Sequence, residues 1–123
     1  RSSNLRDCVI LEAHLKLYKA RKKDVADRIK GYLASRNKSQ DYRYPSCGCF
    51  FKNPKGDSAG RLIDLCGLKG RQVGGAAISD RHANFIINVR NAKSDDVLKL
   101  MSLTIKREQD KFNINLEPEV KIL

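Results

Sequence analysis

The spacing of the apolar residues changes along this chain, and this change restricts the fold to a mixture of strands and helices. Apolar residues alternate with other residues from Val9 to Leu17, the period of a strand with one apolar face. From Lys23 onwards Val25, Ile29 and Leu33 repeat every four residues, which predicts an amphipathic helix that ends around 36–39. Because both periods occur, all-helical and all-strand folds are excluded.

The remaining two thirds of the chain continue this mixture. We expect a short helix over 59–66 that ends at Gly67 in a left-handed conformation, a strand over 82–89, a helix over 94–111 with Ser94 as its N-cap, and an extended tail over 114–123. Val97, Met101 and Ile105, with Leu100 beside them, form the expected buried stripe of the third helix. The elements predict an α+β fold, a two-layer domain with a small mixed sheet and about three helices.

Length and composition exclude several classes of protein. A chain of 123 residues with 41% hydrophobic residues is sufficient for one domain with a modest core. Its apolar runs are far shorter than the ~20 residues that span a bilayer, and no signal peptide opens it, so we expect neither a membrane protein nor a secreted precursor. Because Arg1 is not a methionine, we expect a chain that starts after processing or within a larger protein.

The charge indicates an anionic partner but does not choose one. Lys and Arg number 25 against 14 Asp and Glu, a net charge of +11. Nucleic acid, a phosphorylated small molecule or an acidic lipid surface would all suit this charge, and solubility alone would also explain it. Exposed aromatics among basic residues are typical of sheet-based RNA binders, and only Tyr42 and Tyr44 beside Arg43 approach that pattern.

The cysteines leave a metal site and a redox pair open, and the spacing favours neither. Cys47, Cys49 and Cys66 with His82 could bind zinc, but structural zinc sites usually use pairs separated by two residues. A thiol redox pair at Cys47 and Cys49 also has the wrong spacing for the usual motif. We therefore expect reduced thiols and no metal.

Residues 44–54, YPSCGCFFKNP, combine the most reactive side chains with the least periodicity. Gly48 permits a close approach to a ligand, Cys49 would stand at a turn, and Lys52 and Asn53 suit a diphosphate or a base edge. A buried strand with a glycine bulge would explain the same sequence equally well. In the tail, Glu117 and Glu119 lie on one face of an extended segment, where one could serve as an acid or base.

Four ordered motifs resemble one family closely. GCFFKNP, AGRLIDLCGLKG, GGAAISDRHANFIIN and LEPEV, in this order and spacing, resemble the C-terminal half of UDP-N-acetylenolpyruvoylglucosamine reductase, also called UDP-N-acetylmuramate dehydrogenase. The opening RSSNL resembles the end of the Tyr-Arg-x-Ser signature of that family, so the similarity spans the chain. The resemblance implies a lead-in strand over 1–20 from a missing N-terminal flavin domain and a C-terminal substrate-binding domain over 21–123.

The resemblance also implies a reaction. In this family NADPH reduces FAD, and the flavin then reduces the enolpyruvyl ether of UDP-N-acetylglucosamine enolpyruvate to the lactyl ether of UDP-N-acetylmuramate, a peptidoglycan precursor. FAD would be bound mainly by the missing N-terminal domain, so we expect this chain alone to be inactive. The family further implies a cytoplasmic, monomeric protein whose partners are the substrate and its own flavin domain, with no nucleic acid and no membrane. A basic nucleic-acid-binding module is the alternative.

The motifs place the family's functional residues on this sequence. Arg1 matches the arginine that binds the substrate carboxylate, Glu119 matches the catalytic glutamate, and Lys52 and Asn53 match positions that line the nucleotide-diphosphate pocket. Cys49 stands where most members have the serine that donates a proton, and a thiol with a pKa of about 8.5 is a stronger acid than a hydroxyl. A longer insertion with a substrate-binding tyrosine is not evident, which indicates the shorter subtype.

Overall fold

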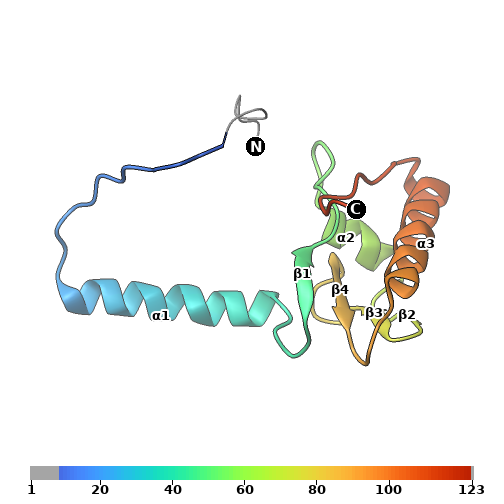
Figure 1. The fold of residues 1–123 in the computed structure, drawn as a ribbon, viewed down its shortest axis with the longest axis horizontal. Coiled ribbons are helices and arrows are strands. Elements are labelled where there is room, and N and C mark those ends of the chain that lie inside the picture. Colours follow the sequence, from blue (N-terminus) through green and yellow to red (C-terminus); the bar gives the residue numbers. More distant parts are fainter. Residues whose placement is uncertain (1–8, 123) are drawn as a thin grey trace.

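The computed structural model describes residues 9–122, with the side chain of Ser39 left aside, and its elements are shown in Figure 1. Seven elements follow one another along the chain: α1 (Lys22–Ser39), β1 (Ser46–Cys49), α2 (Ala59–Leu65), β2 (Gln72–Val73), β3 (Ala76–Ile78), β4 (Phe85–Asn88) and α3 (Ser94–Phe112). The three predicted helices are therefore confirmed, each to within a few residues of its expected ends.

The four strands form one sheet in the order β1-β4-β3-β2. Every neighbouring pair is antiparallel, so the α+β prediction is confirmed but the expected mixed sheet is wrong in this detail. The connections explain the difference, because a two-residue link at Gly74 and Gly75 joins β2 to β3 and a short loop joins β3 to β4. Parallel neighbours need a crossover of a dozen residues or more.

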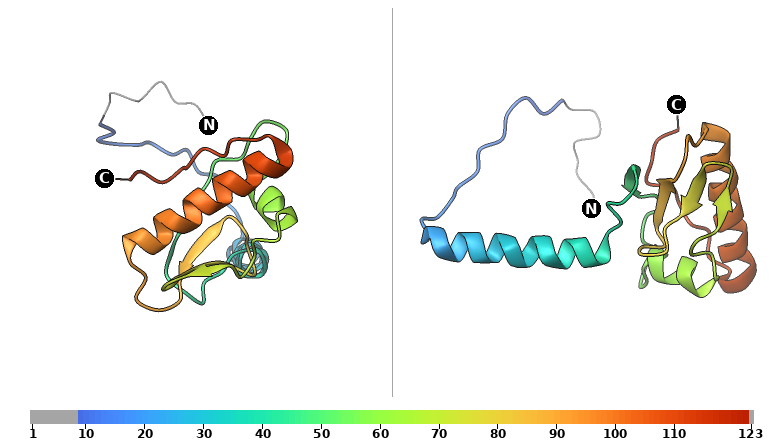
Figure 2. Two further views of the ribbon diagram at one scale, coloured as in Figure 1. Left: turned by 90° about the vertical axis from the view of Figure 1, so that its right-hand side faces the viewer. Right: turned by 90° about the horizontal axis from the view of Figure 1, so that it is seen from below.

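The core lies between one face of the sheet and the two helices that cover it (Figure 2). Side chains from separate elements meet there, and the largest fully buried apolar ones are Phe51, Ile63, Ile78, Leu100 and Leu116. The opposite face carries a smaller buried cluster with Phe85 and Ile87, which confirms that these two residues share one side of their strand. The sheet and helices form the two expected layers.

Glycines shape two turns of this domain. Gly67 has φ +68°, the left-handed conformation predicted for the end of α2. A Cβ on Gly75 would lie 2.0 Å from the carbonyl oxygen of Arg90, so only glycine fits between β2 and β3. The Gly75 N–H also donates to the Asp96 carboxylate at 3.0 Å. Gly67 thus ends a helix, and Gly75 fills a closely packed turn between two strands.

The start and the buried face of α3 differ from the sequence prediction. Lys93 rather than Ser94 is the N-cap, and the Asp96 carboxylate accepts from the Lys93 N–H at 3.1 Å. The fully buried stripe is Leu100, Thr104 and Glu108, whereas Val97, Met101 and Ile105 pack half-buried at its edge. The expected burial of Leu100 is confirmed, but the apolar pattern did not reveal the other two members, because both are polar.

Residues 9–20 form no strand, and the prediction of one over Val9–Leu17 is wrong for this structure. Strand structure needs a hydrogen-bonded neighbour, and this segment runs beside none of the four strands (Figure 1). The helix α1 also projects from the domain, and its stripe of Val25, Ile29 and Leu33 stays at least partly exposed. The packed domain begins at Asp41.

Asp41 fixes the beginning of the packed domain. Its side chain is fully buried, accepts from the Arg43 guanidinium at 2.8 Å and from the Ser79 hydroxyl at 2.7 Å. The Arg43 hydrogen bond is the main reason that the pKa of this carboxyl lies well below its usual range. Ser79 follows β3 directly, so these contacts tie residues 41–43 to the sheet.

Glu108 is a buried acid, and among the described residues neither of its carboxylate oxygens has a hydrogen-bond partner at ordinary distance and angle. The nearby Cys66 thiol offsets the effect of burial only in part. Burial raises its pKa, because the charged form loses its hydration. The unfolded chain ionises this group near pH 4.3, whereas the folded chain keeps it protonated to a higher pH. As pH rises from the pKa of Glu108 in the unfolded chain to its higher pKa in the folded chain, this group therefore lowers the free energy of unfolding.

We predict that Glu108→Leu stabilises the domain. It should raise the free energy of unfolding by about 1–3 kcal/mol at pH 8 and by less at pH 5, where the parent glutamate is closer to neutral in both states. Thermal unfolding of parent and variant at each pH measures this difference. Glu108→Gln is the matched control, since it removes the ionisable group but keeps a buried polar one. A loss of stability in Glu108→Leu at pH 8 would contradict this account.

Candidate functional site

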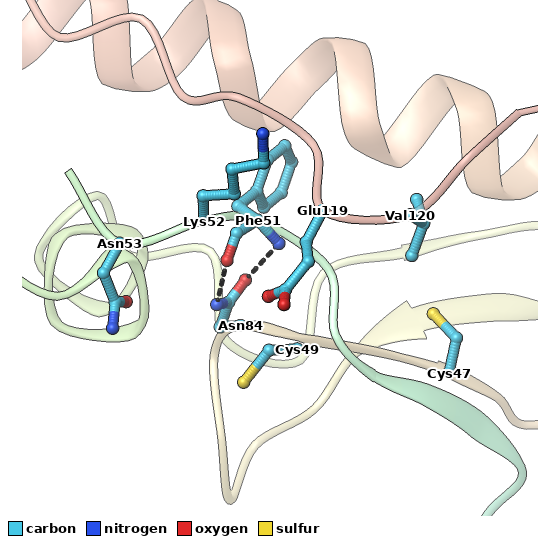
Figure 3. A pocket seen from close by; sticks show the side chains of 8 residues that line it. All are labelled: Cys47, Cys49, Phe51, Lys52, Asn53, Asn84, Glu119 and Val120. Atoms are coloured by element: carbon cyan, nitrogen blue, oxygen red, sulfur yellow. Dashed lines mark hydrogen bonds between the residues drawn. The ribbon is translucent and has the colours of Figure 1, made fainter. Parts of the chain in front are cut away.

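A cavity of about 830 Å³ opens beside the end of β1. Figure 3 shows its eight lining residues: Cys47, Cys49, Phe51, Lys52, Asn53, Asn84, Glu119 and Val120. They come from three parts of the chain, namely β1 with its continuation, the loop before β4, and the C-terminal segment. Four of the five site residues predicted from the sequence, Cys49, Lys52, Asn53 and Glu119, are among them.

The C-terminal segment reaches this cavity by pairing with the continuation of β1. The Lys52 N–H donates to the Glu117 carbonyl at 2.8 Å, and the Glu119 N–H donates to the Phe50 carbonyl at 2.8 Å. Between them Phe51 and Pro118 form an antiparallel bridge. Pro118 has no N–H to donate, so it fits at an isolated bridge of this kind. This pairing brings Glu119 to the cavity from a position 70 residues after Cys49.

Asn84 holds the other side of the same segment. Its side chain is 2% exposed, its Oδ1 accepts from the Phe51 N–H at 2.9 Å, and its Nδ2 donates to the Phe51 carbonyl at 2.8 Å. Its own carbonyl accepts from the Phe50 N–H at 2.8 Å. Sequence reasoning missed Asn84, and the only signal was a polar residue at the entry to an apolar strand.

Cys49 stands at a bulge in β1. Ser46 pairs with Ile87 and Cys49 pairs with Phe85, so β1 contains one more residue than β4 over this stretch. Gly48 has φ +82° within the bulge, a conformation that glycine adopts without strain. The backbone of this segment is therefore a strand with a glycine bulge, as one interpretation of the sequence predicted. The Cys47 and Cys49 thiols are nevertheless exposed, and both line the cavity.

Lys52 and Asn53 are already engaged in contacts within the chain. The Lys52 ammonium pairs with the Glu117 carboxylate, and both side chains are largely exposed. The Asn53 Oδ1 accepts from the Ala59 N–H at 3.0 Å, which ties the rim of the cavity to the first turn of α2. Figure 3 shows these two side chains leaving the backbone in opposite directions. Because the Ala59 N–H already occupies the Asn53 Oδ1, a ligand at Asn53 would meet the NH₂ group of that side chain.

Arg1, the fifth predicted site residue, lies outside the described residues. The zinc candidates Cys66 and His82 do not line this cavity. Cys66 lies at the end of α2 with its thiol directed at the Arg107 carbonyl at 3.6 Å, and burial and then Glu108 raise its pKa to about 11. His82 packs on Phe85, and burial lowers its pKa. Within residues 9–122, no three His, Cys, Asp or Glu side chains are placed to hold a metal ion.

Two further observations bear on the choice of partner. None of the helices described here is both long and apolar enough to cross a membrane. Arg43, the basic residue between Tyr42 and Tyr44, is paired with Asp41 and Asp80 and packs on the Tyr44 ring, so its charge is largely compensated within the chain. The feature that most resembled an RNA-binding surface is thus part of the domain's own structure.

Comparison with known proteins identifies the domain. Residues 40–123 match the family model described as the C-terminal domain of UDP-N-acetylenolpyruvoylglucosamine reductase. This match begins beside Asp41, where the packed domain itself begins, and leaves α1 outside it.

Curated and solved relatives agree with this match. The chain is 48% identical to the UDP-N-acetylenolpyruvoylglucosamine reductase of Chlamydia muridarum over 84% of its own length and 34% of that protein. It is 41% identical to the Geotalea uraniireducens enzyme over 94% of its length and 38% of that protein. It aligns with the crystal structure of the Thermus caldophilus reductase with a TM-score of 0.70 and 42% identity, covering 86% of this chain and 37% of that one. The chain therefore spans about a third of the length of its relatives, and it belongs to the UDP-N-acetylenolpyruvoylglucosamine reductase family through the C-terminal domain of those enzymes.

Proposed function

We propose that this chain is the substrate-binding part of a reductase that converts UDP-N-acetylglucosamine enolpyruvate to UDP-N-acetylmuramate. The observation that carries the proposal is the single cavity that Cys49 and Glu119 share, because the two residues come from opposite ends of the domain. Membership of the family supports the reaction type. In this proposal residues 1–20 lead in from an N-terminal flavin domain, and residues 21–123 belong to the substrate-binding part.

The cavity suits an anionic sugar nucleotide better than a flavin ring. Its lining includes an ammonium group, two amides and a carboxylate, whereas an isoalloxazine needs a broad apolar slot. The family resemblance implies that FAD is held mainly by the N-terminal domain. Bound there, it would supply to the enolpyruvyl double bond the hydride that comes from NADPH.

The residues of this chain would manage the charge and the proton of that step. Hydride addition places negative charge on the substrate carboxylate as an enolate, and groups that stabilise this charge lower the barrier. Arg1 would bind the carboxylate through a bidentate pair, and Glu119 would act at the same end. Cys49 would then donate its thiol proton to the adjacent carbon. In this proposal all three side chains act on the enolpyruvyl group of the substrate.

The nucleotide end of the substrate is assigned to the rim of the cavity. The Lys52 ammonium and the Asn53 NH₂ would donate to diphosphate oxygens, with Lys52 exchanging its exposed contact to Glu117 for the ligand. Such an exposed ion pair is worth about 0–1 kcal/mol, so a dianionic ligand can displace it. The proposal also includes the shorter subtype, a monomer and a cytoplasmic location, with which the exposed thiols of Cys47 and Cys49 are consistent.

We predict that Cys49→Ala lowers kcat of the intact enzyme by about 100-fold or more, because general acid catalysis contributes about 10²–10⁴. Cys49→Ser should retain more activity than Cys49→Ala, since a hydroxyl can still donate a proton. Steady-state turnover with NADPH and the enolpyruvyl substrate measures both. Cys66→Ser is the control and should turn over normally, because that thiol faces the Arg107 carbonyl. Near-full activity in Cys49→Ala would remove the assigned role.

We predict that Glu119→Ala lowers kcat about 10²–10³-fold, the usual effect of losing one group that stabilises charge in the transition state. Reduction of the flavin by NADPH should be unchanged, because that half-reaction takes place before the substrate binds. Stopped-flow measurement of flavin reduction and of reoxidation by substrate separates the two steps. Glu117→Gln is the matched control on the same segment, and its reoxidation rate should stay close to that of the parent. Equal losses in both variants would indicate a structural effect instead.

A further inference from the structure

We propose that Cys47 and Cys49 form a peroxide-sensitive disulfide, which makes the cavity a site of reversible oxidation. The consequence for activity depends on the proposed function, because the disulfide would remove the proton that Cys49 supplies. The formation of the bond itself depends only on the geometry of β1.

The first argument is that the two thiols share one environment. Both are exposed, both line the 830 Å³ cavity, and one residue separates them. A small oxidant that enters the cavity therefore meets both sulfurs. Cys66 provides the contrast, because it follows the end of α2, its thiol is partly buried, and its raised pKa of about 11 keeps it in the unreactive protonated form.

The second argument concerns the bend that the bond requires. In Figure 3 the Cys49 sulfur points away from Cys47, and a disulfide needs Cβ atoms about 3.5–4.5 Å apart, so the backbone must turn between them. The bulge lies there, since the regular register stops at Ser46 and resumes at Cys49. Gly48 in its centre has φ +82° and open space on the side where a Cβ would stand. Its backbone can therefore rotate without a side chain to obstruct it.

The third argument is that this bend costs little elsewhere. In the sheet order β1-β4-β3-β2, β1 is an edge strand, so within the described residues its outer side has no strand pairing to break. On its inner side the pairing with β4 is regular at Ser46 and Cys49 and is already interrupted between them, where the bend would lie. Cys47, Gly48 and Cys49 are themselves at most half-buried and contribute nothing to the main core cluster. A disulfide across one residue is strained, and strained or exposed disulfides are the ones that cellular dithiols reduce readily.

The oxidant is hydrogen peroxide, and the reaction balances in two steps. One thiolate attacks a peroxide oxygen, which gives a sulfenic acid on that cysteine and releases water after one proton is taken up. The second thiolate then attacks the sulfenic sulfur, the S–S bond forms, and the hydroxyl leaves as a second water. Two thiols and one peroxide thus give one disulfide and two waters. A dithiol reductant restores both thiols by exchange and is itself oxidised to a disulfide.

Trypsin provides a direct test, because Arg43 and Lys52 bound a single peptide, YPSCGCFFK, that holds both cysteines. The intact protein is treated with hydrogen peroxide, alkylated and digested, and its activity is followed in parallel. We expect the peptide to lose two hydrogens and escape alkylation, and a dithiol to reverse this. Cys66→Ser is the matched control and should give the same disulfide. Cys47→Ser should over-oxidise at Cys49 and, relative to its own starting rate, recover less activity after a dithiol.

Each result has a distinct meaning. If the peptide keeps two alkylatable thiols, is oxidised without an internal bond, or is bridged to Cys8 or Cys66, the proposed site is wrong whatever happens to activity. If the internal disulfide forms and activity falls in proportion, both the site and its consequence are supported. If it forms while activity is retained, the oxidation site stands and the role of Cys49 as proton donor is overturned.

Discussion

The arrangement of this domain depends on the pair of hydrogen bonds between the Asn84 side chain and the backbone of Phe51. The amide replaces a neighbouring strand for that residue, because it satisfies both the N–H and the carbonyl at a buried position. Each of these groups would cost about 1–3 kcal/mol if buried without a partner. With Phe51 fixed, residues 50–52 are held straight enough to pair with the C-terminal segment, and that pairing places Glu119 over the cavity.

Sequence periodicity predicted the helices well because each carries an apolar stripe, and it failed where tertiary contacts decide the structure. The alternating residues 9–17 have the pattern of a strand, but a strand exists only beside a partner, and none of the described strands lies there. The two-residue β2 and three-residue β3 are too short to show a period, and alanines dominate β3. The buried face of α3 contains Thr104 and Glu108, which no apolar pattern can reveal.

The candidate site, too, could be predicted from the sequence only in part. Motifs that resemble a family predicted Cys49, Lys52, Asn53 and Glu119, and the fold brings these four to one cavity. Their roles remain proposals. Asn84 and Cys47 also line the cavity, but the resemblance gave neither of them a role there. Only the three-dimensional structure shows that they belong to the site. The contact of Lys52 with Glu117 was equally invisible, because 65 residues separate the two along the chain.

A crystal structure of the intact protein with UDP-N-acetylglucosamine enolpyruvate bound would test the central claim most directly. The account predicts that the enolpyruvyl group enters the cavity between Cys49 and Glu119, with the Cys49 sulfur about 3–3.5 Å from the carbon that receives the proton. It would be contradicted if the enolpyruvyl group were bound elsewhere and both side chains faced solvent.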